Sequence, residues 1–265
     1  MSISTVPCHH SEKISHRGVL LRLTEALRNL SKDETVSIAK KYAENNKLVW
    51  EASICHVFSA VLKEPKHIPG NIGTKNDDGK AAIEKWVKKY IKGLKGKTTI
   101  RISNLPGTIA DPIIDKIIGT RLTNLNQGDL EKIKFAHRLS MSAENILGLM
   151  LEEYLSVNLE RVGWHCAWGE TVKSVDFVHE DGRLLQIKNR SNSENSSSSA
   201  VRAGTTIQKW FRVKADRVEY MWDAINKICG LNNLSENAFE KFVIQCVTQN
   251  PGCVAVENEN PWQNS

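Results

Sequence analysis

The stretch "SVDFVHEDGRLLQIKNR", residues 174 to 190, decides the fold of this chain, because it has the pattern of two β-strands around a tight turn. If "EDG" forms a three-residue loop with Gly182 in the left-handed conformation, Phe177 pairs with Leu185. A two-residue "DG" loop would shift this pairing by one residue. The sequence leaves both registers open.

The register decides which side chains meet. With the three-residue loop, Asp176 lies opposite Gln186, and alternation along the strands places Asp176, Gln186 and Lys188 on one face. With the shorter loop Asp176 would pair with Ile187 and the three groups would separate. Three polar groups that converge on a sheet are costly unless something compensates them.

A divalent metal would supply that compensation. Held by Asp176 and neighbouring oxygens, it could polarise a phosphoryl oxygen and acidify a bound water, while Lys188 stabilises the developing negative charge. The hairpin therefore favours phosphodiester hydrolysis. The alternative is a surface hairpin whose charges are unconnected.

Helical and strand patterns continue on both sides of the hairpin. Before it, "SAENILGLMLEEYLSVNLERVG" predicts an amphipathic helix that starts near Ser142 and ends before Gly163, followed by a strand at "WHCAWGE". After it, "TTIQKWFRV" fits a strand or a helix, and "EYMWDAINKICGL" and "SENAFEKFVIQCV" predict helices. This order predicts an α/β fold with a mixed central sheet flanked by helices.

The chain before this unit reads as mostly helical. The expected elements are helices within residues 18–62 with a capping box at "SKDE" (31–34), a loop at 63–80, a basic helix at about 80–94, a short strand in "TTIRISNLPG" (98–107) and two helices within about 108–140. We therefore expect a helical region at 1–140, for DNA clamping or dimerisation, and a catalytic core at 141–265.

Positive charge is concentrated in two segments. The net charge is +6; residues 84–101 carry seven Lys or Arg against one acid, and residues 188–217 carry seven against two, so the rest of the chain sums to −5. Such concentration suits a polyanion such as nucleic acid. A solvated helix face would also explain the first segment.

Other features exclude several classes of protein. No apolar run approaches the roughly 18–20 residues of a membrane helix, and the polar amino terminus lacks the core of a secretion signal, so we expect a cytoplasmic protein. Six cysteines without a CxxC pair indicate reduced thiols, neither disulfides nor zinc ligands. This spacing argues against a cysteine- or zinc-based enzyme, and "CHH" at 8–10 reads as incidental.

The hairpin and the preceding helix resemble the PD-(D/E)xK nuclease superfamily. Its core has Asp on one strand and (Glu or Gln)-x-Lys on the next, and "LEEYLSVNLERVGW" (151–164) looks like its first helix, which often offers a Glu to the metal site. The resemblance implies Glu152 as that acid, with Glu153 as the alternate. Gln186 replaces the usual second carboxylate and ligates Mg²⁺ more weakly, so another acid must compensate. The acids available for this are Glu152, Glu170 and, more distantly, Glu194.

More narrowly, residues 143–245, and above all 174–212, resemble the SinI type of type II restriction endonucleases. That resemblance implies a restriction-endonuclease-like core and Mg²⁺-dependent cleavage of double-stranded DNA at a short palindromic, GC-flanked site similar to GGWCC. It also implies a cognate DNA methyltransferase in a restriction–modification system. A palindromic target favours a homodimer, because each strand must meet an identical active site.

The polar, basic run after Lys188 then has an interpretation as a DNA-contacting segment. Ser and Asn can donate to phosphate oxygens, and Arg can read guanine with two bonds. The expected DNA-binding residues are Arg190, Asn192, Asn195, Arg202, Lys209 and Arg212. Alternatively, Trp210 and Phe211 are core and the basic side chains near them face water.

Two other functions remain open on the sequence alone. One is a different DNA nuclease of the same superfamily, either methyl-directed or involved in repair. The other is a nucleic-acid-binding protein that does not cleave, in which Gln186 marks a silenced site.

Overall fold

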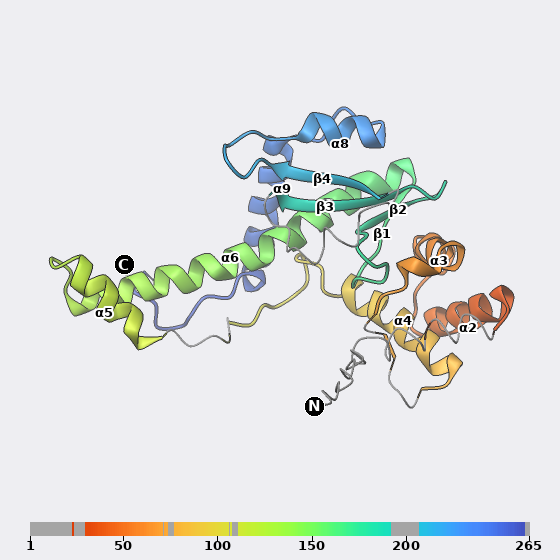
Figure 1. Cartoon of the computed structure of the whole chain (residues 1–265), viewed down its shortest axis with the longest axis horizontal. Helices are drawn as coiled ribbons and strands as arrows, with labels where there is room; N and C mark the ends of the chain where they lie inside the picture. The colour runs from red at the N-terminus through yellow and green to blue at the C-terminus, as the bar shows by residue number, and fades with distance from the viewer. Residues whose placement is uncertain are drawn as a thin grey trace, which may run out of the picture.

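The structure is a computed structural model that describes residues 23, 30–70, 72–73, 77–105, 107, 111–191 and 207–262. Its elements in chain order (Figure 1) are α2 (Lys32–Asn45), α3 (Ile54–Lys63), η1 (Pro65–His67), α4 (Gly79–Leu94), α5 (Pro112–Arg121), α6 (Gln127–Leu159), η2 (Glu160–Val162), β1 (Trp164–Cys166), β2 (Phe177–His179), β3 (Leu184–Arg190), β4 (Gln208–Val213), α8 (Trp222–Cys229), α9 (Glu236–Gln249) and η3 (Pro251–Cys253).

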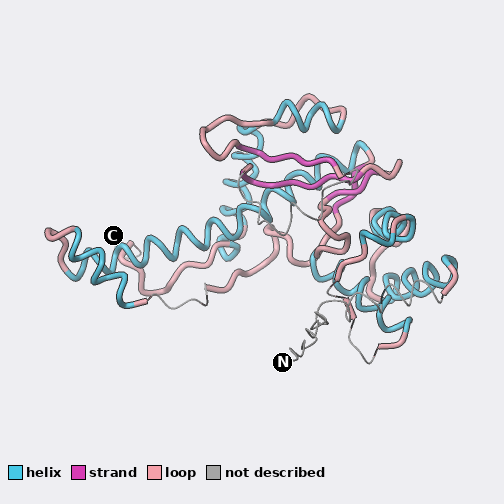
Figure 2. Tube along the Cα trace, viewed as in Figure 1, coloured by secondary structure: helices cyan, strands magenta, loops and turns pink. Residues whose placement is uncertain are grey.

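Four strands form one mixed sheet in the order β1-β2-β3-β4, with two antiparallel pairs and a parallel β3–β4 pair. Phe177 pairs with Leu185, and Gly182 has φ +96° in the turn, so the predicted three-residue loop is confirmed. The segment "TTIQKWFRV" provides the strand β4. Helices flank the sheet (Figure 2), and the predicted α/β fold with a restriction-endonuclease-like core is confirmed.

Helix α6 is 33 residues long and runs from the projecting end of the molecule to the sheet. It begins after Asn126, whose side chain forms a capping box with Asp129. The predicted start near Ser142 is wrong, because the helix passes through Ser142, which is buried within it. The expected division between residues 140 and 141 falls inside α6, and the two-domain organisation stays a prediction.

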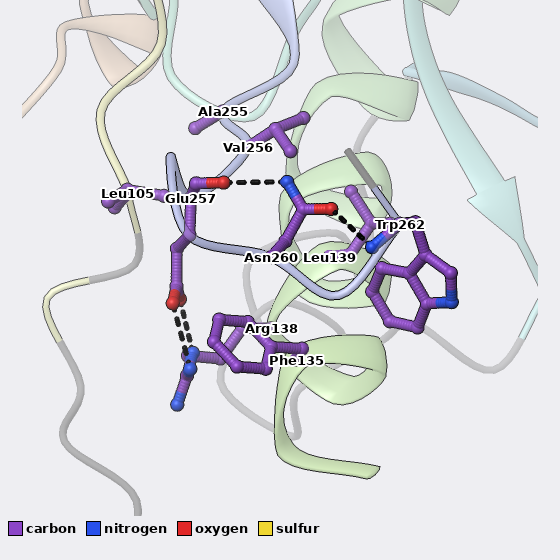
Figure 3. Close-up of a pocket in the computed structure, with 9 residues that line it drawn as sticks. All are labelled: Leu105, Phe135, Arg138, Leu139, Ala255, Val256, Glu257, Asn260 and Trp262. Carbon is purple, nitrogen blue, oxygen red and sulfur yellow. Dashed lines mark hydrogen bonds and ion pairs between the residues drawn. The ribbon is translucent and has the colours of Figure 1, made fainter. Parts of the chain in front are cut away.

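Helix α5 and the first half of α6 project from the sheet as an arm, along which the C-terminal segment runs (Figure 1). Figure 3 shows how this segment is fastened: the carboxylate of Glu257 pairs with the guanidinium of Arg138, which also lies over the ring of Phe135. The Asn260 amide donates to the Glu257 carbonyl at 2.7 Å, and the Trp262 backbone N–H donates to Asn260 Oδ1 at 3.1 Å.

One cluster of buried side chains joins the N-terminal helices to the sheet. Leu155 and Leu159 of α6 are fully buried in it together with Trp164 and Phe177 of the sheet. Phe58 of α3 belongs to the same cluster, so the helical region and the sheet share a core. Within the described residues, no helix is both long and apolar enough to span a bilayer.

The expected short strand in "TTIRISNLPG" is wrong for its described part, which forms a turn and then an irregular segment. The reason is local: the hydroxyl groups of Thr98 and Thr99 donate to Glu153 of α6, and Ser103 bonds the backbone near Cys253. These bonds hold the segment against α6 and η3, and it pairs with no described strand.

Candidate active site

Asp176 lies one residue before β2 and is held by backbone bonds on both sides. Its amide donates to the Leu185 carbonyl at 2.9 Å, and its own carbonyl accepts from the Ala167 amide at 2.8 Å. Its carboxylate Oδ2 accepts from the Ile187 amide at 2.7 Å. Asp176 is therefore fixed beside β3 with its half-buried carboxylate at the end of the sheet.

A cavity of about 500 Å³ opens at this end of the sheet, and Asp176, Gln186 and Lys188 all line it together with Glu170. The three hairpin residues therefore share one side of the sheet, as the register predicts. Gln186 is buried, and its Oε1 has no hydrogen-bond partner among the described residues. A buried amide oxygen without a donor has a lone pair to offer to a ligand.

Glu152 of α6 faces the same charges. Burial raises the pKa of its carboxyl group to about 8, the negative charge of Asp176 adds to the rise, and the ammonium group of Lys188 opposes it. Glu152 lines a second cavity of about 340 Å³, which shares Glu170 with the first. The structure thus brings Glu152 together with the hairpin residues.

Glu153 points elsewhere, because successive residues of an α-helix are about 100° apart. Its buried carboxylate accepts bonds from the hydroxyl groups of Thr98 and Thr99 and from the Thr99 amide at 3.2 Å. The sequence could not separate the two acids; the structure puts Glu152 at the cavity and Glu153 in a buried structural contact.

Glu170 is held near the site by a close backbone contact that the sequence did not reveal. A Cβ at Gly93 of α4 would lie 2.2 Å from the Gly169 nitrogen, and a Cβ at Gly169 would lie 2.3 Å from the Lys89 carbonyl oxygen. Only glycines permit this approach. The indole of Trp86, also in α4, donates to the Thr171 carbonyl at 2.8 Å. Helix α4 therefore positions the loop that carries Glu170.

The same contact brings positive charge to the site. The cavity lined by Glu152 is bordered by the basic wall, a group of cations at and after the end of α4 that comprises Lys89, Lys92, Lys97 and Arg101. The ammonium of Lys89 lies 3.6 Å from a carboxylate oxygen of Glu170. The predicted basic helix is confirmed as an element, and its last turns face the acids.

Three of the expected DNA-binding residues are described. Arg190 at the end of β3 and Lys209 on β4 are exposed. Arg212 is instead turned into the protein: its guanidinium bonds Asn189 Oδ1 at 2.9 Å and pairs with Glu236 of α9, and its side chain is 11% exposed. Trp210 is buried, as the alternative interpretation of this segment expects. The other expected DNA-binding residues, Asn192, Asn195 and Arg202, lie outside the described part, as does Glu194, the most distant candidate acid.

This donor set fits a hard divalent cation. Carboxylate and amide oxygens are the ligands that Mg²⁺ prefers. The charge of Asp176 raises the cost of ionising Glu152, and the Oε1 atom of Gln186 lacks a donor among the described residues. A cation would relieve both features. Water hydrolysis at a phosphodiester is the chemistry that such a site, bordered by lysines, can support.

Comparison with known proteins gives consistent results. The sequence model of the family described as SinI restriction endonuclease matches residues 36–249. Over 175 residues, 64% of this chain and 76% of the relative, the chain is 39% identical to the type II restriction enzyme Eco47I of Escherichia coli. Over 143 residues, 52% of this chain and 62% of the relative, it is 42% identical to the type II restriction enzyme SinI of Salmonella infantis.

Proposed function

Because the chain belongs to the SinI restriction endonuclease family, we propose that the cavity lined by Asp176, Gln186 and Lys188 is its active site for Mg²⁺-dependent hydrolysis of double-stranded DNA. Family membership confirms the predicted type II restriction endonuclease. The observation that carries the site assignment is that these three residues line one cavity and that the charges of Asp176 and Lys188 both act on the carboxyl group of Glu152.

The acids and Lys188 have separate roles in this proposal. Asp176 and Glu152 hold Mg²⁺, with Glu170 and the Gln186 Oε1 atom as further oxygen donors. When bound, the cation polarises the phosphoryl oxygen and acidifies water. The ammonium of Lys188 orients the attacking water and stabilises charge that develops on the phosphate.

The basic wall supports a path for the DNA backbone. Its cations come from a segment that carries seven Lys or Arg against one acid, and they border the cavity that contains Glu152. Lys92 and Lys97 would neutralise phosphates close to the scissile bond. Arg190 and Lys209 are exposed near the sheet and are proposed to contact the DNA, together with the predicted Asn192, Asn195 and Arg202.

Cleavage of supercoiled plasmid DNA with Mg²⁺ tests the active site. Wild type and Lys227→Ala, which changes an exposed lysine on α8, should cleave equally, whereas Lys188→Ala should lose cleavage and keep DNA binding. Equal cleavage by Lys188→Ala would contradict the assignment of the site. Silence of all three proteins would favour the alternative of a binding protein that does not cleave.

We propose a short palindromic target with GC flanks, similar to GGWCC, and a cognate methyltransferase that protects the host sequence. Both rest on the resemblance of residues 174–212 to this family. Digestion of unmethylated phage DNA, followed by sequencing of the fragment ends, identifies the site and the cut position. Cleavage only of methylated DNA would instead indicate a methyl-directed nuclease. The cytoplasmic location expected from the sequence stays a prediction.

We also propose that the enzyme acts as a homodimer through its arm. Helix α5 buries none of its residues, and Ile113, Ile114 and Ile117 on it are about half exposed or more. Such an apolar helix on a projecting arm suits a self-complementary contact, and a palindromic site needs two identical active sites. A second copy of this chain is therefore the proposed occupant.

Light scattering coupled to gel filtration tests the dimer. The double variant Ile113→Asp/Ile117→Asp should be monomeric and should nick DNA instead of cutting both strands. The control Ile244→Asp places the same charge at an exposed apolar position on α9 and should remain dimeric. A wild-type monomer, or a double variant that is still a dimer, would contradict the proposed interface.

A further inference from the structure

A second group of potential metal ligands lies away from the proposed active site. His56 of α3, His165 of β1 and Glu180 of the β2–β3 turn each offer one ligand atom, and these atoms lie within 4.8 Å of one another. His56 comes 109 positions before His165 in the sequence, and α3 lies beside β1 and β2 (Figure 1). The cluster therefore joins the N-terminal helical region to the outer end of the hairpin.

The geometry within the cluster is close to that of a metal site. His165 Nε2 lies 3.2 Å from Glu180 Oε1, and His56 Nε2 lies 4.0 Å from the same oxygen. The two imidazole rings are stacked with centroids 4.2 Å apart. Ligand atoms bound at ~2.0–2.1 Å to a tetrahedral ion lie about 3.3 Å from each other, so small side-chain rotations suffice.

The imidazole of His165 is buried, whereas the carboxylate that shares its cluster is open to solvent. His165 is 5% exposed, and its Nδ1 has no hydrogen-bond partner in the described part of the chain. The ring nitrogen that faces the cluster is Nε2, which lies 3.2 Å from Glu180 Oε1 and is the atom that would ligate an ion. The Glu180 side chain is about half exposed, so an ion can enter from solvent and keep a water ligand.

We propose that His56, His165 and Glu180 bind one Zn²⁺ ion that fastens helix α3 to the sheet. Two imidazoles and one carboxylate form a ligand set that zinc prefers over Mg²⁺, with a fourth position for water.

This site is distinct from the proposed nuclease site. Glu180 and Asp176 lie at opposite ends of the β2 segment, four residues apart, which corresponds to roughly 13 Å along an extended strand. The ligands of the proposed Mg²⁺ site are oxygen atoms, whereas this cluster offers two nitrogens. Zinc binding can therefore be measured without reference to DNA cleavage.

The test is a zinc titration of the full chain, stripped with EDTA, against a chromophoric competitor. Wild type should bind one Zn²⁺ per chain at the site and should gain thermal stability on binding. His56→Ala and Glu180→Gln should each weaken the binding at least about 10-fold, because each removes one of three ligands. Both affected side chains are at least partly exposed, so the fold should survive.

Two controls locate the ion. His137→Ala removes an exposed histidine on α6, and Asp176→Asn disables the proposed Mg²⁺ site; both should bind Zn²⁺ as wild type does. The proposal is overturned if wild type takes up no Zn²⁺, or if Glu180→Gln and His56→Ala, folded by circular dichroism, bind it as tightly as wild type. Loss of binding in Asp176→Asn alone would place the ion in the nuclease site instead.

Discussion

The raised pKa of Glu152 predicts how the Mg²⁺ affinity of the proposed site changes with pH. Its pKa is raised from 4.5 to about 8, first by burial and then by the charge of Asp176. A cation must displace the proton from this group before Glu152 can ligate it. At pH 7 about one chain in 11 has Glu152 ionised, so the apparent Mg²⁺ affinity should be about 10-fold weaker than at pH 9. At pH 6 the apparent Mg²⁺ affinity should be about 100-fold weaker than at pH 9.

The assay is the Mg²⁺ concentration for half-maximal plasmid cleavage, measured at constant ionic strength from pH 6 to pH 9. For wild type this concentration should fall about 10-fold per unit up to roughly pH 7.5 and level off above pH 8. Glu152→Gln should cleave more slowly and lose this slope, because an amide has no proton to release. A pH-independent requirement in wild type, or an unchanged slope in Glu152→Gln, would refute the assignment of Glu152 as a ligand.

The stability of the metal-free chain provides an independent measure of the same group. Since the pKa of Glu152 is higher in the folded state, its protonated form stabilises the fold at pH below 4.5, and this contribution is lost as pH rises to about 8. Between those values the free energy of unfolding should fall by at most about 1.4 kcal/mol per unit, relative to Glu152→Gln. Urea unfolding in EDTA measures the difference, and Mg²⁺ should reduce it.

Three further perturbations test the surroundings of the site. Gly93→Ala should lower the free energy of unfolding, measured by urea denaturation, by about 1–3 kcal/mol, because the added Cβ meets the backbone of the facing loop. The control Gly148→Ala places a Cβ in open space on α6 and should raise the free energy of unfolding slightly. Glu153→Ala should cost about 1–3 kcal/mol by leaving its buried donors unsatisfied, while the pH slope of Mg²⁺ activation stays unchanged. Lys92→Gln should reduce the salt slope of DNA binding in Ca²⁺ by about 0.9 for a lost phosphate contact, and the exposed Lys132→Gln on the arm should not.

Most elements of the fold can be predicted from local sequence patterns. The capping box at Ser31 and Glu34 and the loop with Gly182 are set by neighbouring residues, and both occur as predicted. The start of α6 was misplaced because Ser142 resembles an N-cap, whereas the helix is stabilised further upstream by the box at Asn126. A local signal of this kind does not show whether a helix already precedes it.

Contacts between segments that are distant in the sequence could not be predicted from the spacing of residues along the chain. The approach of Gly93 to Gly169 depends on how α4 docks on a loop that is 76 positions later, and a glycine in a helix predicts no particular partner. The same holds for His56 and His165, which are 109 positions apart and meet only because α3 packs on β1. The sequence argued against zinc because it offered no closely spaced ligands, and tertiary packing removes that requirement.

The glutamine at position 186 follows from the electrostatics of its surroundings. The negative charges of Asp176 and Glu170 already oppose the ionisation of Glu152. A carboxylate at the buried position of Gln186 would add another negative charge there, opposed mainly by Lys188, and would raise the pKa of Glu152 further. The amide supplies an oxygen without that cost. The departure from the usual carboxylate is therefore compatible with a working cation site, because Glu152 on α6 provides the charge that position 186 lacks.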